Sequence, residues 1–320
     1  MNYKPILIVH GEPNSIFLEI FFKSIKFKKF KSPLILICSY KLLKYQMKIL
    51  GFKNKINLIK LSDLRKKINN SSINVIDIDY KLQLKFKRIS KESKDYIKKS
   101  FNTAFKIINL GITNKLINGP ISKKAFLNKN YLGMTEYISD KFKVKKNAML
   151  IYNKRISVCP ITTHLPLKLV AKKIKPNLIV DKVILVNNFY KTYLNKKPRI
   201  AVLGLNPHCE SIERINEDEK IILPTVKLLK KLNYKIFGPF SADTMFLKQN
   251  RNKFDVILGM YHDQVLTPIK TLLEYDAVNI TLGLPFLRIS PDHGPNEKML
   301  GKNISNPLSL IRSIQFLDKN

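Results

Sequence analysis

Short runs of β-branched and other apolar residues alternate along this chain with longer segments of helical periodicity. This alternation predicts an α/β fold with a largely parallel sheet. We predict strands at 5–10, 33–39, 73–78, 115–120, 147–153, 155–162, 199–205, 254–260 and 277–283. We predict helices at 92–110, 121–129, 166–173, 177–194, 217–231 and 264–275. Since no Gly-, Pro- or Ser-rich linker interrupts the pattern, ordinary secondary structure must join any two lobes.

The length of 320 residues and the hydrophobic content of 45% allow a buried core and more than one lobe. No apolar run approaches the roughly 20 residues that span a bilayer, and the first residues read as a strand rather than a signal peptide. Three widely spaced cysteines form no CxxC pair, which favours a reducing compartment. We therefore expect a soluble cytoplasmic protein with no membrane partner.

The net charge is unusual, because 58 Lys and Arg residues against 23 Asp and Glu give +35. Such an excess raises the question of a polyanionic partner. The excess is mostly lysine and is spread along the chain together with abundant Asn and Ile, which is typical of AT-rich coding sequence. No recognised nucleic-acid-binding module is present. We therefore do not expect nucleic acid as a partner, although a polyanion-binding protein remains an alternative.

Three of the five histidines share one layout, in which the histidine lies just beyond an apolar strand. His164 closes ISVCPITTH, His208 closes RIAVLGLNPH and His262 closes FDVILGMYH. In open α/β sheets, ligand sites collect outside the carboxyl ends of the strands. Three imidazoles at that edge are suited to a divalent metal with positions left open for substrate. The alternative is three separate histidines that make local hydrogen bonds, but the repeated layout favours a metal site.

Basic residues follow the same strands. Arg288 comes after the strand predicted at 277–283, and Lys270 lies on the helix that follows His262. The segment 118–126, NGPISKKAF, reads as a strand, a turn and a helix start with Lys123 beside it. Free N–H groups at a helix start and basic side chains both suit anions. Because the chain is rich in lysine, surface positions remain the alternative for the two lysines.

The sequence contains neither GxGxxG nor GxxxxGK[ST]. The early segment GEPNSI follows a strand, but it lacks the glycines that let a backbone approach a pyrophosphate. A nicotinamide cofactor held by a standard Rossmann fingerprint is therefore not supported. No cofactor-binding residue can be assigned from these patterns.

Taken together, the motifs resemble those of the 4-hydroxythreonine-4-phosphate dehydrogenase family. GPISK, GMTEY, ITTHLPL, RIAVLGLNPH, GPFSADTMF, MYHDQ, VNITLGLPFLRIS and DHG occur in the family's order and spacing. The resemblance runs from about residue 5 to about residue 312. It implies a two-lobed fold like that of isocitrate and isopropylmalate dehydrogenases, with mostly parallel sheets and an interlobe cleft. The expected lobes are 1–125 with 285–320, and 126–284.

The resemblance also implies a reaction and a site. The family oxidises 4-phosphooxy-L-threonine with NAD or NADP, and the product decarboxylates to 3-amino-2-oxopropyl phosphate in pyridoxal 5'-phosphate biosynthesis. It works as a homodimer with the active site at the subunit interface. His164, His208 and His262 match its ligands to a divalent metal (zinc, magnesium or cobalt). The positions that match its substrate-binding residues are Thr135, Lys270, Asn279 and Arg288.

Other features leave alternatives open. A proton acceptor is needed, and Asp263 and Lys123 are both candidates. Met134 stands where the family usually has a substrate-contacting histidine, and several loop glycines are replaced, as in GEPNSIFLE and DHGPN. These departures motivate two alternatives. One is a related dehydrogenase of phosphorylated four-carbon sugar acids, of the phospho-threonate or phospho-erythronate type. The other is a catalytically drifted polyanion-binding paralogue.

Overall fold

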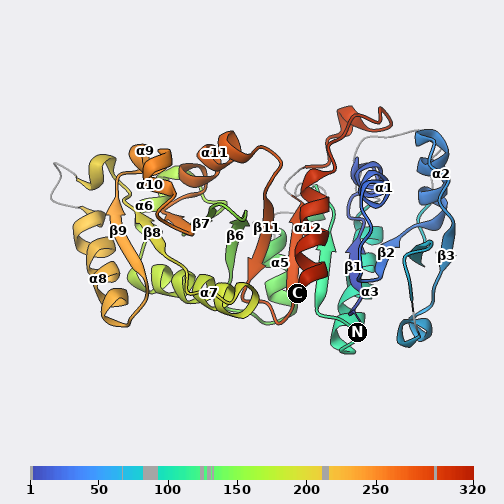
Figure 1. Ribbon diagram of the computed structural model, residues 1–320, viewed down its shortest axis with the longest axis horizontal. Helices are drawn as coiled ribbons and strands as arrows, with labels where there is room; N and C mark the ends of the chain where they lie inside the picture. The colour runs from blue at the N-terminus through green and yellow to red at the C-terminus, as the bar shows by residue number, and fades with distance from the viewer. Residues whose placement is uncertain are drawn as a thin grey trace. The chain divides into compact units, whose positions relative to one another are not determined.

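The computed structural model describes residues 3–66, 68–81, 93–122, 126–127, 131, 133–210, 216–291 and 294–320. The chain forms two compact units. The first combines Met1–Ile138 with Pro285–Asn320, the blue-to-green and red parts of Figure 1, and the second is Ser139–Leu284. The first boundary therefore lies within helix α5 (Met134–Lys141), whereas the sequence-based division was placed after residue 125.

The strands of the first unit are all parallel and run in the order β3-β4-β2-β1-β5-β12. Their bounds are β1 (Ile6–Val9), β2 (Leu34–Cys38), β3 (Ile56–Leu58), β4 (Ile73–Asp77), β5 (Lys115–Asn118) and β12 (Leu287–Pro291). Every residue of β1 and β2 is buried. Strands covered on both faces read as continuous apolar runs, which is why ILIV and LILIC were recognisable in the sequence.

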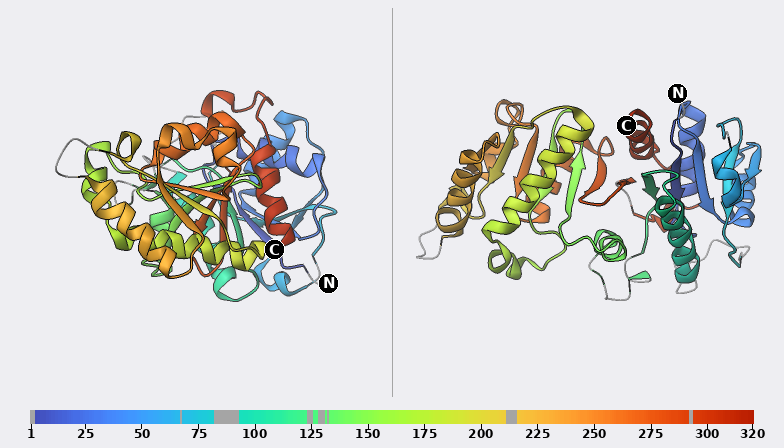
Figure 2. Two further views of the ribbon diagram at one scale, coloured as in Figure 1. Left: turned by 60° about the vertical axis from the view of Figure 1, so that its left-hand side comes forward. Right: turned by 90° about the horizontal axis from the view of Figure 1, so that it is seen from below.

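Helices cover both sides of these strands, as Figure 2 shows. Their bounds are α1 (Phe17–Phe27), α2 (Tyr40–Leu50), η1 (Leu61–Arg65), α3 (Ser93–Asn109), α5 (given above), η5 (Glu297–Met299) and α12 (Leu308–Lys319). From β1 to β2 the chain moves in one direction across the sheet, and from β4 to β5 it moves in the other. Since crossovers between parallel strands are right-handed, α1 and α3 pack on opposite faces.

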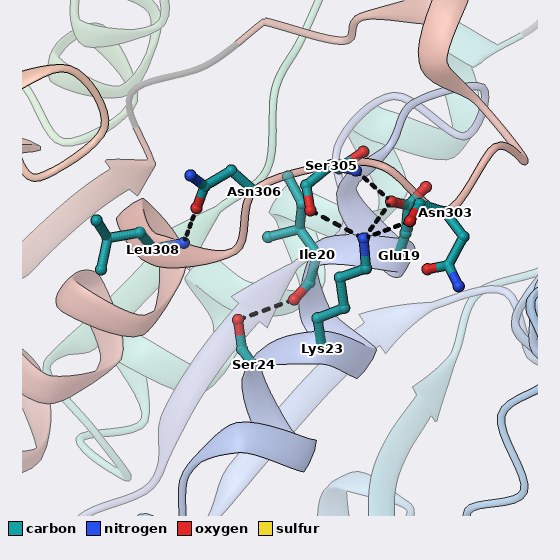
Figure 3. A network of polar contacts seen from close by, with 8 residues as sticks. All are labelled: Glu19, Ile20, Lys23, Ser24, Asn303, Ser305, Asn306 and Leu308. Atoms are coloured by element: carbon teal, nitrogen blue, oxygen red, sulfur yellow. Dashed lines mark hydrogen bonds and ion pairs between the residues drawn. The ribbon is translucent and has the colours of Figure 1, made fainter.

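One buried carboxylate fixes the C-terminal segment of the first unit to α1 (Figure 3). Glu19 is 1% exposed and accepts hydrogen bonds from Lys23 Nζ at 2.9 Å and from the Ser305 backbone N–H at 2.6 Å. The same Lys23 Nζ donates to the carbonyl oxygens of Asn303 and Ser305, both at 2.9 Å. The buried charge is therefore paired, and the segment before α12 is held in place.

The strands of the second unit run in the order β11-β6-β7-β10-β8-β9. Strands β7, β10, β8 and β9 are parallel, and β6 is antiparallel to both β7 and β11. Their bounds are β6 (Ala148–Tyr152), β7 (Ser157–Pro160), β8 (Ile200–Leu203), β9 (Ile236–Phe240), β10 (Val256–Gly259) and β11 (Val278–Leu282). The carboxyl ends of β7, β10 and β8 consequently lie side by side at one edge.

The helices of the second unit include the π-helical turn η4. Their bounds are η2 (Leu167–Leu169), α6 (Val170–Lys173), α7 (Pro176–Leu194), η3 (Pro207–Cys209), η4 (Asp218–Ile222), α8 (Leu223–Lys231), α9 (Ala242–Met245), α10 (Lys248–Arg251) and α11 (His262–Leu273). Helix α11 packs against β7 and β10. None of the helices in the described parts of either unit is long and apolar enough to cross a lipid bilayer.

The predicted α/β class with a mostly parallel sheet is confirmed, and each of the nine predicted strands overlaps an observed one. The segment 237–246, which has the form of a strand, a Gly-Pro turn and a helix start, corresponds to β9 and α9, whereas the sequence missed strands β3 and β12 and helices α1, α2, α5 and α12. The helix predicted at 121–129 lies largely outside the described residues. Helix α2 carried recognisable end signals, because Ser39 caps its first turn and Gly51 ends it with a φ of 72°.

Candidate functional site

The three predicted histidines follow three neighbouring parallel strands of the second unit. His164 follows β7, His208 follows β8 and His262 is the first residue of α11 after β10. The rings of His164 and His262 face each other with centroids 5.8 Å apart. His208 is exposed on a turn with a φ of 55°. Within the described ranges, no three His, Cys, Asp or Glu side chains are close enough to hold a metal ion, so the arrangement is a pair and a separate third imidazole.

The neighbouring carboxylate of Asp263 orients the ring of His262. The Nδ1 atom of His262 lies 2.6 Å from Oδ1 of Asp263, whose side chain is 79% exposed. A carboxylate accepts a hydrogen bond, so this contact places the ring proton on Nδ1 and leaves the Nε2 lone pair available to a ligand. Metal-binding histidines commonly have this carboxylate partner. The donor set of His164 and His262 therefore fits a divalent ion that prefers nitrogen ligands.

A buried carboxylate shapes the loop that carries His208. Asp218 is 1% exposed and accepts from the backbone N–H groups of Leu205 at 2.7 Å and Asn206 at 3.0 Å. A Cβ atom at Gly204 would lie 2.7 Å from Asp218 Oδ1 and 2.6 Å from Cys209 Sγ, so the turn requires glycine at this position. The sequence showed this segment only as a strand followed by NPH, and the role of Asp218 depends on tertiary structure.

Arg288 of the first unit lies inside the sheet. It follows the strand predicted at 277–283, observed as β11, but it is the second residue of a further strand, β12, which was not predicted. Its side chain is 3% exposed, and Nε donates to Oδ1 of Asn118 at 2.7 Å. Burial lowers the pKa of Arg288 to about 10, and the charge of Glu136 opposes this shift. The guanidinium therefore stays charged at neutral pH, in a position where a phosphate or carboxylate could pair with it.

The remaining predicted substrate residues are half-buried. Thr135 lies in the first turn of α5, Lys270 in α11 and Asn279 in β11. The Asn279 amide oxygen is buried and accepts no hydrogen bond from the described part of the chain. Such an atom carries an energetic cost unless a ligand or water donates to it, which supports its role as a binding residue. The other predicted residue, Lys123, lies outside the described residues.

Two ionisable groups at the end of β1 have shifted pKa values that the sequence did not predict. His10 and Glu12 are both fully buried. Burial lowers the pKa of His10 to about 3 and raises that of Glu12 to about 7, the latter against an opposing hydrogen bond from Ser93. Tyr96 Oη lies 3.0 Å from His10 Nδ1 and accepts from the Ser39 backbone N–H, so its hydroxyl proton points to the imidazole. His10 is therefore held neutral with its own proton on Nε2.

Comparisons with known proteins agree with the motifs. The family model described as pyridoxal phosphate biosynthetic protein PdxA matches residues 29–317. A 4-hydroxythreonine-4-phosphate dehydrogenase from Sulfurihydrogenibium sp. is 38% identical over 317 residues, covering 97% of this chain and 96% of the relative. A putative D-threonate 4-phosphate dehydrogenase from Oceanobacillus iheyensis is 29% identical over 326 residues, covering 98% and 97%. The structure of a 4-hydroxythreonine-4-phosphate dehydrogenase from Klebsiella pneumoniae superimposes with a TM-score of 0.83 at 26% identity, covering 99% of both chains.

Proposed function

The chain belongs to the family of the pyridoxal phosphate biosynthetic protein PdxA, and we propose that it is a 4-hydroxythreonine-4-phosphate dehydrogenase. The observation that carries this proposal is the imidazole pair of His164 and His262, with Asp263 against one ring, at the carboxyl ends of two neighbouring strands. The reaction converts the 3-hydroxyl of 4-phosphooxy-L-threonine to a ketone, with a hydride passing to NAD or NADP and a proton released. The resulting 2-amino-3-oxo-4-phosphooxybutanoate then loses CO2 to give 3-amino-2-oxopropyl phosphate.

The basic and amide side chains bind and place this substrate in the proposal. Arg288 and Lys270 pair with its phosphate and carboxylate, since guanidinium and ammonium groups suit both anions. Thr135 and Asn279 supply hydrogen bonds to its neutral and amino groups. For Asn279 the support is its buried amide oxygen, which can accept from an ammonium or a hydroxyl.

His164, His208 and His262 would hold a divalent ion such as zinc, magnesium or cobalt. When bound, the ion supplies a Lewis acid for the substrate hydroxyl, and NAD or NADP supplies the hydride acceptor. Asp263 orients the ring of His262 in the proposal, and its exposed carboxylate is also a candidate proton acceptor. Lys123 remains the other predicted proton acceptor. We also propose that the protein is a cytoplasmic homodimer. In such a dimer His208 could bind the ion of its own subunit or that of the partner subunit.

Purified protein with added Co²⁺ or Zn²⁺ should reduce NAD or NADP when 4-phosphooxy-L-threonine is supplied, and His208→Ala should abolish the signal. An exposed-amide variant, Gln249→Ala, provides a matched control that should retain full activity. Absence of NADH and NADPH production by a folded protein with bound metal would refute the proposed substrate.

A second substrate class is supported by one observation at the site. Met134 is half-buried at the start of α5, next to Thr135, and a thioether neither donates a strong hydrogen bond nor carries charge. One polar contact to the amino acid substrate is therefore replaced by an apolar one. Phosphorylated four-carbon sugar acids such as D-threonate 4-phosphate, which lack the amino group, are the alternative. Comparing kcat/KM for the two substrates on the same preparation decides between them.

A further inference from the structure

Gln264 uses both ends of its side-chain amide to join the ends of two strands. It lies in the first turn of α11, two residues after His262. Its Oε1 atom accepts from the backbone N–H of Met260 at 2.6 Å, just beyond β10. Its Nε2 atom donates to the carbonyl oxygen of Gly204 at 2.8 Å, just beyond β8. The start of the His262 helix is thereby tied to the loop that leads to His208.

The third histidine loop joins the same backbone segment. The carbonyl oxygen of Met260 accepts from Thr162 Oγ1 at 2.7 Å, and the Gly259 carbonyl accepts from the Ile161 N–H at 2.7 Å. Met260 thus has its N–H bound by Gln264 and its carbonyl bound by the loop that leads to His164. All three histidine loops are connected through hydrogen bonds that meet at Met260 and Gln264.

The absence of a side chain at Gly259 leaves room for this amide against the strand end. A Cβ atom at Gly259 would lie 2.9 Å from Gln264 Oε1 and 2.4 Å from Val265 Cγ1. The glycine therefore permits the close approach of the side chain to the strand end. A half-buried amide with both ends bonded to backbone groups holds its surroundings in one arrangement, because losing either bond leaves a polar group unsatisfied.

We propose that Gln264 is a positioning residue that sets the spacing of the three histidine loops for the divalent ion. This inference rests on the proposed function, and it holds whether His208 binds the same ion as the pair or the ion of a second subunit. The two hydrogen bonds of the Gln264 amide run to the backbone of Met260 and of Gly204, so its effect on the histidines passes through these residues. Groups that orient metal ligands typically contribute about ten- to a hundredfold to metal affinity.

Two substitutions separate the two arms of the amide. Gln264→Leu keeps the approximate volume and removes both hydrogen bonds. Gln264→Glu keeps the acceptor for the Met260 N–H, but its carboxylate would face the Gly204 carbonyl with no proton to donate. If Gln264 acted only on the turn at Met260, Gln264→Glu would bind the divalent ion as tightly as wild type. If it acts by joining β10 to β8, both variants should bind the ion more weakly.

The test is titration of metal-free protein with Co²⁺, followed by d–d absorption, for wild type, Gln264→Leu, Gln264→Glu and the exposed control Gln249→Leu. We expect Kd to rise about ten- to a hundredfold in both Gln264 variants and to stay unchanged in the control. Hydrogen exchange of the metal-free proteins should be faster in residues 204–209 of both variants. Wild-type protein that binds no Co²⁺ would refute the proposed metal site and this inference with it. Tight Co²⁺ binding by wild type and both Gln264 variants alike, with unchanged exchange, would overturn the inference alone.

Discussion

The two units hold their candidate functional groups in different ways. In the second unit the imidazoles lie in the segments just beyond the strand ends, His262 at the first residue of α11, and these segments are fixed by hydrogen bonds to backbone groups. In the first unit Arg288 lies within a strand, 3% exposed, where it donates a hydrogen bond to Asn118 and the negative charge of Glu136 favours its charged form. A side chain beyond a strand end can be truncated without disturbing the packing of the core. A buried charged side chain such as Arg288 belongs to that core, so its truncation also lowers stability. Substitutions should therefore separate function from stability in the second unit and couple them in the first.

The largest effect should come from His262→Ala. Loss of one imidazole of the pair should lower kcat/KM by about a thousandfold, since Lewis-acid stabilisation contributes several kcal/mol to the transition state. The half-exposed ring packs little, so the free energy of unfolding should change by less than about 1 kcal/mol. Steady-state kinetics and urea unfolding on the same preparation measure both quantities. A fall of several kcal/mol in the free energy of unfolding alongside the loss of activity would contradict the contrast between the two units.

Arg288→Ala should cost stability as well as activity. It leaves the buried Asn118 amide oxygen without its donor and removes the positive charge near Glu136, and an unsatisfied buried acceptor typically costs about 1–3 kcal/mol. Arg288→Lys keeps the charge but not the planar donor geometry, so it should recover part of the stability and little of the substrate affinity. Urea unfolding gives the stability, and KM gives the affinity. A stable, inactive Arg288→Ala protein would contradict the core role of this residue.

Glu12 should make the first unit lose stability as pH rises. Its pKa is about 7 in the folded protein against the ordinary value of 4.5, so unfolding releases a proton between these values and stability falls as pH rises through that window. The wild type should lose about 3 kcal/mol relative to Glu12→Gln between pH 4.5 and pH 8. His10, whose pKa is lowered to about 3, acts in the opposite direction but is present in both proteins and cancels in the difference. Parallel pH–stability curves for the two proteins would refute the burial argument.

The smallest effect should come from Asp263→Asn. The variant keeps an acceptor for the His262 Nδ1–H but removes the negative charge, so Co²⁺ affinity should fall about tenfold. Stability should not change measurably, because the Asp263 side chain is 79% exposed. Co²⁺ titration and thermal unfolding check the two expectations. An unchanged Kd would show that the carboxylate does not support the imidazole.

The sequence was informative where apolar runs ended in distinctive residues. ISVCPITTH and FDVILGMYH predicted both the strands and the edge at which His164 and His262 meet, because strand ends in a parallel sheet share an edge. Partners that come from distant segments could not be predicted. Asn118 contacts Arg288 and Asp218 orders the His208 loop only after the chain has folded. β12 was missed because only four residues separate it from β11, so the segment around Arg288 was read as the sequence after a strand end rather than as a second strand.

The central claim is that the imidazole pair of the second unit is part of a divalent metal site. The most direct test is the stoichiometry of Co²⁺ binding to wild type, His164→Ala and His262→Ala, with Gln249→Ala as the exposed control. The account predicts one tightly bound ion per chain in wild type and the control, with nitrogen ligation in the absorption spectrum, and loss of that ion in both histidine variants. Retention of the tightly bound ion by folded His164→Ala and His262→Ala proteins would contradict it.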